Sequence, residues 1–480
     1  MKIGKRPLDS TYAESIKPVR NQMRRYTYQS LLDAILVYLN IQSTGSRLKD
    51  LQRLPWVAER LAIWLFADKT YEYGSQIANE QDLKRLIDLA WNAADKGYGS
   101  GNPIKQIGLS VRQVFLPQIP YQQTLYAYSY GLQLYLIKKL PPNSKLRKFL
   151  NEKDEMAIED YFEVALLYWT HSATSKPWFN EHFVSSLTNA FSTNIQERFI
   201  HSITHKLEDF QELCRARTIQ IDEWFQPTYF YKTPCIWQSG AAVPFGPQTL
   251  RRYFDTLIAD WIAESNRTDL RQDFDALVES YVAETLRRGQ ITFIGEKEIK
   301  QLVNGGRLVD FMIEDSSSVV LLEVKNKVLS QAVPASRDPL ELVSSLKATV
   351  VKAQSQLADA ESSLKLLAHY KNKTFHRVIV TSNDLWLSSA ELLSDKEASS
   401  TKTWLLSLRE LDMLTEVAKT KAWSVGEFFA RFEENQKDSL SATFSIEAYL
   451  ERMHLKPERL PSHIRKEVEN LFGNIKTRLD

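Results

Sequence analysis

Cysteine is scarce in this sequence, with only Cys214 and Cys235 among 480 residues. Two cysteines so far apart provide neither the ligand spacing of a structural zinc site nor a disulfide framework. Such scarcity is typical of a chain that works in a reducing compartment. We therefore expect a cytoplasmic protein.

Long apolar runs are also missing. No stretch of 18 or more apolar residues occurs, so we expect no transmembrane helix and no membrane partner. The first 26 residues are basic but contain no apolar segment of the kind that a secretory signal needs. The hydrophobic content of 43% and charged content of 25% are those of an ordinary globular protein.

Charge of one sign is not in large excess, because the formal net charge is only +2. Total charge therefore gives no indication of a nucleic-acid partner. Basic residues do cluster locally, at Lys2, Lys5, Arg6, Lys17, Arg20, Arg24 and Arg25, and again at Arg251 and Arg252. Such clusters can contact phosphates, although each one alone is more simply explained as a solvated surface.

The first half of the chain has a helical pattern. From about residue 28 to 216, apolar residues recur at spacings of three and four. Turn residues such as Pro141-Pro142-Asn143-Ser144 separate the helices. We predict an all-α N-terminal domain over residues 1–225, with a basic arm at 1–27. The clearest helical stretches are SLLDAILVYLNIQ, WVAERLAIWLFADKTYEY, DLKRLIDLAWNAADK and AIEDYFEVALLYW.

His201 and His205 lie four residues apart on a predicted helix, where both would point to one side. Such a pair can bind zinc, but the intervening residues include no glutamate that could act as a general base. We interpret them as ordinary surface histidines.

The segment from Phe225 to Pro247 contains four prolines and two glycines, which predicts an extended connection. With the helix TLRRYFDTLIADWIAE that follows, it forms a predicted junction over residues 226–268.

Residues 269–415 alternate between helix and strand patterns. DFDALVESYVAETLRR has one apolar stripe and is predicted as a helix. Strands are predicted for ITFIGEKEI, RLVDFMIE, VVLLEVKNK, FHRVIVTSN and TWLLSLREL, and a long helix for about 340–370. The resulting order αβββαβ, with one further strand, indicates an α/β domain with a mixed central sheet flanked by helices. Residues 416–480 are predicted to form a helical C-terminal tail.

The predicted hairpin between RLVDFMIE and VVLLEVKNK carries three charged residues inside apolar strands. Asp310 lies six residues before Ser316, and Glu323 lies six residues after Ser317. A tight turn centred on the two serines would place Asp310 opposite Glu323, with Cβ atoms about 4.5–5.5 Å apart. Glu323 and Lys325 would share one face because side chains alternate along a strand.

Two adjacent carboxylates repel, so one of them tends to take up a proton. A divalent cation removes this penalty, and all-oxygen ligation suits Mg²⁺ or Mn²⁺. Such an ion polarises a phosphodiester and lowers the pKa of a bound water. Lys325 would orient that water or stabilise negative charge on the phosphate. An incidental surface hairpin is the ordinary alternative, but charges within apolar strands are costly unless they have a role.

GGRLVDFMIEDSSSVVLLEVKNK resembles the core of the PD-(D/E)XK nuclease superfamily, which has the restriction-endonuclease-like fold. The resemblance covers residues 270–415 and departs from the usual motif at Val309, where proline is common. It implies that Asp310 and Glu323 bind metal, with the backbone carbonyl of Val324, and that Lys325 is the catalytic lysine.

The resemblance also implies residues on two helices. Glu279 is the best match to a glutamate on the helix before the sheet, and Glu284 is the alternative. A glutamine or lysine often lies on the helix after the motif. Gln354 is our candidate there, with Gln356 and Lys352 left open.

The expected function is a Mg²⁺- or Mn²⁺-dependent DNA endonuclease, with RNA as an open alternative substrate. Large helical regions joined to such cores resemble bacterial defence proteins against phage or plasmid DNA. This likeness predicts a second protein subunit or a homodimer as partner. The competing hypothesis is a catalytically inactive nuclease-fold protein that binds nucleic acid or acts as a scaffold subunit. No zinc finger or zipper heptad is present to read bases.

Overall fold

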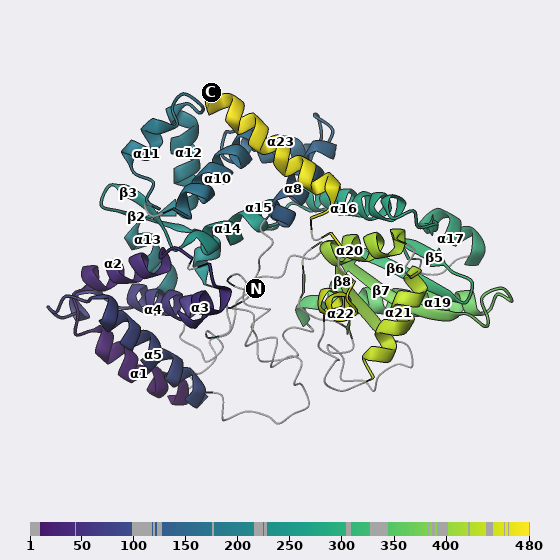
Figure 1. Cartoon of the computed structure of the whole chain (residues 1–480), viewed down its shortest axis with the longest axis horizontal. Coiled ribbons are helices and arrows are strands. Elements are labelled where there is room, and N and C mark those ends of the chain that lie inside the picture. Colours follow the sequence, from purple (N-terminus) through teal and green to yellow (C-terminus); the bar gives the residue numbers. More distant parts are fainter. Residues whose placement is uncertain are drawn as a thin grey trace.

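The computed structural model is mostly helical and contains two β-sheets (Figure 1). It describes residues 10–43, 45–97, 118, 121, 127–174, 177–215, 224, 228–303, 309–326, 344–382, 384–385, 389–390, 402–420, 423–437, 445–455, 457–458 and 460–479. Among these residues, no helix combines the length and the apolar character that crossing a membrane requires.

The chain begins with a helical bundle, as predicted. Its helices share a core built around residues such as Val19, Leu31 and Trp64. Two arginines of the basic N-terminal cluster, Arg20 and Arg24, form ion pairs with the buried carboxylate of Asp68, so this part of the cluster is structural. The helices are α1 (Ser10–Met23), α2 (Tyr28–Leu39), α3 (Arg47–Gln52), α4 (Pro55–Ala67) and α5 (Glu80–Gly97).

A second group of helices follows from residue 127. The predicted turn at residues 141–144 is confirmed, and the Ser144 hydroxyl accepts a hydrogen bond from the Arg147 N–H at the start of the next helix. The prediction of one helix through His201 and His205 is wrong, because α12 ends at Ile203 and His205 lies in a strand. The helices are α8 (Ala127–Lys139), α9 (Lys145–Glu152), α10 (Ile158–Ser172), α11 (Glu181–Ser186), α12 (Thr193–Ile203) and α13 (Leu207–Arg215).

The predicted extended connection contains a small sheet. The strands β2 (Cys235–Gln238) and β3 (Ala241–Pro244) form an antiparallel hairpin, and β1 (Thr204–His205) pairs in parallel with β2. The helix predicted after it is two helices, α14 (Pro247–Asp255) and α15 (Leu257–Ser265). Arg251, expected in a basic cluster, is 3% exposed and pairs with Asp255.

The second sheet has five strands in the order β4-β5-β6-β7-β8. β5 is antiparallel to its neighbours β4 and β6, while β6, β7 and β8 run parallel. Two predicted strands were too long, because helices begin at Glu296 and at Leu408. The elements are α16 (Thr268–Arg288), β4 (Phe293–Gly295), α17 (Glu296–Val303), β5 (Phe311–Glu314), β6 (Ser318–Lys325), α19 (Lys352–Lys365), β7 (Thr374–Thr381), β8 (Thr403–Ser407) and α20 (Leu408–Lys419).

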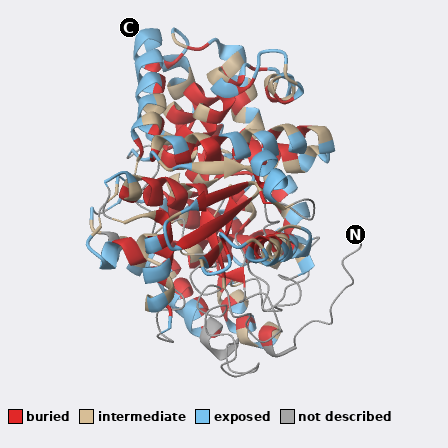
Figure 2. Ribbon diagram, turned by 90° about the vertical axis from the view of Figure 1, so that its right-hand side faces the viewer, coloured by how far each residue is buried: buried red, intermediate tan, exposed pale blue. Residues whose placement is uncertain are grey.

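Helices cover both faces of this sheet, and its strands are buried between them (Figure 2). Side chains such as Val320 and Leu322 belong to the same core as α16 and α20. Side chains of the opposite face, such as Leu321 and Ile379, belong to the core of α19. The alternation along β6 follows from the period of two in a strand.

The C-terminal residues are helical, as predicted, and pack back onto the rest of the chain. α21 (Val425–Asn435) contacts β6 and β7, α22 (Ile446–Arg452) contacts α20, and α23 (Ser462–Leu479) lies along α8 (Figure 1). Gly131 of α8 permits this approach, because a Cβ there would lie only 2.6 Å from Ile464. One hydrophobic core therefore joins residues on both sides of positions 268 and 415.

Candidate active site

The hairpin of β5 and β6 has the predicted register. Phe311 pairs with Leu322, and Glu314 pairs with Val319. Asp310 and Glu323 occupy the next positions beyond the Phe311–Leu322 pair. The turn is fixed at Asp315, whose carboxylate accepts hydrogen bonds of 2.8 Å from the Ser424 hydroxyl and the Gly426 N–H.

A backbone contact joins Asp310 to β6. The N–H of Val324 donates a hydrogen bond of 2.6 Å to Oδ2 of Asp310. The N–H and C=O of one strand residue point to the same side. The Val324 carbonyl, predicted as a ligand, therefore also points to the side of β6 on which Asp310 lies.

Glu323 is almost completely buried, with 2% exposure. Lys325, on the same face of β6, donates a hydrogen bond from Nζ to Oε1 of Glu323. Oε2 of Glu323 is buried and has no hydrogen-bond partner. A buried carboxylate oxygen without a hydrogen bond of good geometry is costly, because it has lost its contact with water.

The charges at the site are unbalanced toward the negative. Burial, followed by the charge of Asp310, raises the pKa of Glu323 to about 7, and the Lys325 ammonium opposes this shift. Burial also raises the pKa of Asp310, against the hydrogen bond from Val324. One ammonium group thus serves two carboxylates that repel each other.

The α16 helix brings Glu279 into this electrostatic environment. Partial desolvation, then the charges of Asp310 and Glu296, raise the pKa of Glu279, and Lys325 lowers it. Glu284 is directed elsewhere: its carboxylate accepts hydrogen bonds from the Tyr135 hydroxyl at 2.5 Å and from Lys139 Nζ at 3.1 Å. Of the two glutamates, Glu279 is therefore the one that interacts electrostatically with Asp310 and Lys325.

Glu296, at the start of α17, is a further acidic residue near the site that was not predicted, and its charge raises the pKa of both Asp310 and Glu279. Gly295, Phe311 and Leu322 pair in a row across β4, β5 and β6. The residues next in line are Glu296, Asp310 and Glu323. Glu296 directly follows Gly295, which ends the short strand β4. That position brings it next to Asp310 only because of the register of β4 against β5, which the sequence alone does not show.

The helix α19 carries Gln354 and Gln356 near its N-terminal end. Both residues are half-buried, and the neighbouring Ala353 and Leu357 pack in the core on the Glu323 face of the sheet. Lys352 is exposed. Both glutamines remain candidates for the role expected of Gln354.

The donor set suits a divalent cation such as Mg²⁺, since it consists of carboxylate and carbonyl oxygens. The unbonded Oε2 of Glu323 and the repulsion with Asp310 are the features that a cation would relieve. Within the part of the chain that the structure describes, no three His, Cys, Asp or Glu side chains are already grouped as a metal site. Binding would thus require side-chain rearrangement, beginning with the Lys325–Glu323 pair.

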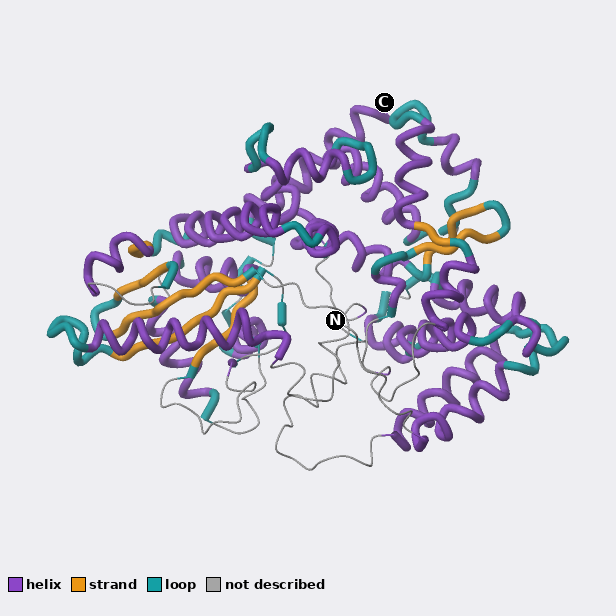
Figure 3. Tube along the Cα trace, turned by 180° about the vertical axis from the view of Figure 1, so that it is seen from behind, coloured by secondary structure: helices purple, strands orange, loops and turns teal. Residues whose placement is uncertain are grey.

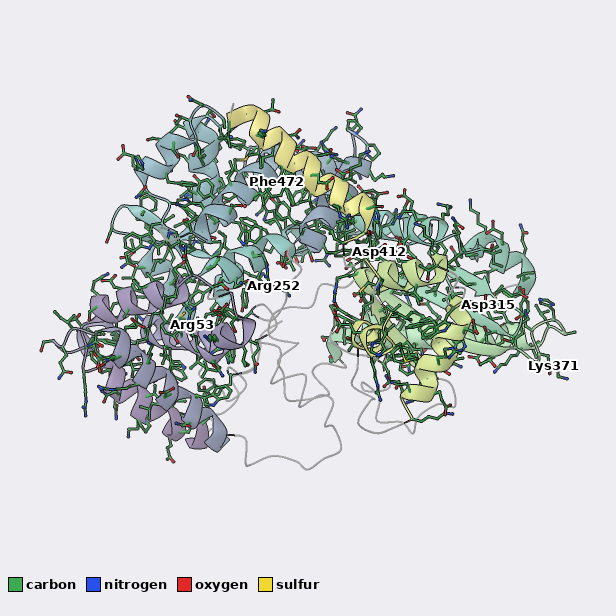
Figure 4. All side chains as sticks on the ribbon, viewed as in Figure 1. Arg53, Arg252, Asp315, Lys371, Asp412 and Phe472 are labelled. Atoms are coloured by element: carbon green, nitrogen blue, oxygen red, sulfur yellow. The ribbon has the colours of Figure 1, made fainter. Side chains whose placement is uncertain are left out.

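The two ends of the five-stranded sheet differ in position. Asp315 and Lys371, which precede the first residues of β6 and β7, mark the end that we call the outer end (Figure 4). The candidate site lies at the other, inner end. Glu323 and Lys325 lie at the opposite end of β6, on the side of the sheet that faces the N-terminal half.

Comparison with family models, with curated proteins and with solved structures found no match.

Proposed function

We propose that this protein is a Mg²⁺- or Mn²⁺-dependent nuclease with a restriction-endonuclease-like core, and that DNA is its substrate. Two features support the fold assignment. The sheet is mixed and flanked by helices, and its elements follow the order α16, β4, α17, β5, β6, α19 and β7, which is the order expected from the resemblance with the short helix α17 inserted after β4. The proposal is also supported by Asp310, Glu323 and Lys325, which lie close together at one end of β6.

The observation that carries the proposal is the state of Glu323. A purely structural buried acid is expected to have both oxygens hydrogen-bonded. Glu323 instead has one unbonded oxygen and a second carboxylate beside it. Perturbed acids of this kind gather at sites where charge is used in catalysis.

Each residue has a distinct proposed role. Asp310, Glu323, Glu279 and the carbonyl of Val324 would hold the ion. When bound, the ion supplies polarisation of the phosphodiester and a lower pKa for the attacking water. Lys325, with 24% of its side chain exposed, donates a charge-assisted hydrogen bond to negative charge that develops on the phosphate.

The test is cleavage of supercoiled plasmid with Mg²⁺ or Mn²⁺, against EDTA. Lys325→Ala is the test variant. Lys371→Ala is the matched control, because Lys371 is exposed at the outer end of the sheet. We expect nicking by wild type and by the control only with metal, and a rate at least about 10²-fold lower for Lys325→Ala. Equal nicking by the two variants would refute the assignment.

A further inference from the structure

The N-terminal half contains a cavity of about 940 Å³ that the proposed nuclease activity does not use. It is formed by α11, α12, β1, α13 and the turn between β2 and β3. This small sheet and the five-stranded sheet lie in different parts of the molecule (Figure 3). The cavity volume is in the range of sites that bind small molecules or peptide side chains.

The lining is apolar on its inner side. Phe179 is buried, Val184 and Ile200 are half-buried, and Leu213 is 39% exposed. Trp237 projects from β2 with 47% of its surface exposed. A large, half-exposed aromatic side chain in the lining of an apolar cavity is a typical anchor for a binding partner.

The polar part of the lining is acidic. Four carboxylates line the cavity, those of Glu181, Glu197, Asp209 and Glu212, and its basic side chains are Lys206, His201 and His205. Within the described residues, none of these carboxylates forms an ion pair, although Asp209 accepts a hydrogen bond from the backbone of Lys206. The cavity thus offers uncompensated negative charge beside an apolar and aromatic surface.

We propose that this cavity binds a segment of a partner protein in which Lys or Arg side chains flank a large apolar residue. The apolar residue would occupy the space beside Ile200 and Leu213, and a cation would lie over Trp237, where the ring face attracts it. Nucleic acid is disfavoured, because its phosphates would meet the four carboxylates. This inference does not depend on the nuclease proposal.

The experiment is selection from a random peptide display library on the full-length protein, followed by affinity measurement on the enriched peptides. We expect enrichment of peptides that combine basic and large apolar residues. Trp237→Ala should weaken their binding about ten-fold or more. Trp178→Ala is the matched control, because Trp178 is equally exposed, at 44%, but does not line the cavity.

The acidic side is tested with Glu197→Gln and Glu212→Gln together, against the exposed Glu208→Gln on α13. The double variant should weaken binding at low salt and reduce its salt dependence. Plasmid cleavage should be unchanged in all these variants. No enrichment, an acidic consensus, or equal binding by Trp237→Ala and wild type would overturn the proposal.

Discussion

Two acidic side chains, Glu323 on β6 and Asp412 on α20, are each 2% exposed, but their surroundings differ. Oδ2 of Asp412 accepts hydrogen bonds of 2.6 Å from the hydroxyls of Tyr128 and Tyr281. Its Oδ1 accepts one from Thr285 at 3.1 Å. Glu323 has one lysine partner, one unbonded oxygen and a second carboxylate close by.

The contrast separates a structural acid from a candidate functional one. Asp412 connects α20 to α8 and α16, close to the start of α23, where His463 contacts Tyr281 at 3.0 Å (Figure 4). A carboxylate whose oxygens both accept hydrogen bonds holds a structure together. The incomplete hydrogen bonding of Glu323 is instead what the proposed function would explain, with a bound cation as the missing partner.

The largest expected effect is on cleavage. Lys325→Ala should lower the rate of plasmid nicking by about 10²–10³-fold, because it removes a donor to charge that develops in the transition state. Asp412→Asn should retain nicking when assayed below its melting temperature. A loss of nicking in Asp412→Asn without unfolding would break the distinction between the two acids.

The next effect is on stability. Asp412→Ala should lower the free energy of unfolding by about 3 kcal/mol, because three buried hydroxyls lose their acceptor. Glu416→Ala on the same helix is the control, since Glu416 is partly exposed and forms only a weak ion pair with Lys419. Chemical denaturation measures both. Equal losses of unfolding free energy in Asp412→Ala and Glu416→Ala would show that Asp412 has no special structural role.

A smaller effect separates the two glutamates of α16. Glu279→Gln should lower nicking by about 10–100-fold, because it weakens the ligand set. Glu284→Gln should leave nicking unchanged and lower stability by no more than about 1 kcal/mol, since its contacts are with α8. Nicking rates at several Mg²⁺ concentrations test this. A larger loss of nicking in Glu284→Gln than in Glu279→Gln would assign the metal-binding role to Glu284.

The smallest effect is on pH dependence without metal. Because the folded-state pKa of Glu323 is raised from 4.5 to about 7, the folded protein binds more protons than the unfolded chain between these values. The free energy of unfolding should therefore fall as pH rises through this window. Denaturation in EDTA should show a drop in the free energy of unfolding across this pH window that Glu323→Gln lacks. A parallel pH profile in the variant would contradict the raised pKa.

The hairpin was the most predictable part of the site. A polar turn between two apolar strands fixed the register, and the register fixed which residues face each other. Glu296 was not predictable in the same way, because EKEIKQLV follows β4 directly and fits both a strand and a helix. The β2–β3 hairpin was hidden by its prolines, and it is held by pairing of Ala242 with the distant Phe179. Such contacts are set by tertiary packing and leave no local pattern.

The Asp310–Glu323 pair is the proposed cation site, and stabilisation of the folded protein by Mn²⁺ is the sharpest test of it. The free energy of unfolding of the wild type, measured at pH 8, should rise with Mn²⁺ concentration, by about 2.7 kcal/mol at one hundred times the dissociation constant. Glu323→Gln should lose this rise, while Asp412→Asn should retain it from a lower starting stability. If Mn²⁺ does not stabilise the wild type, or stabilises Glu323→Gln equally, then the Asp310–Glu323 pair is not a cation site.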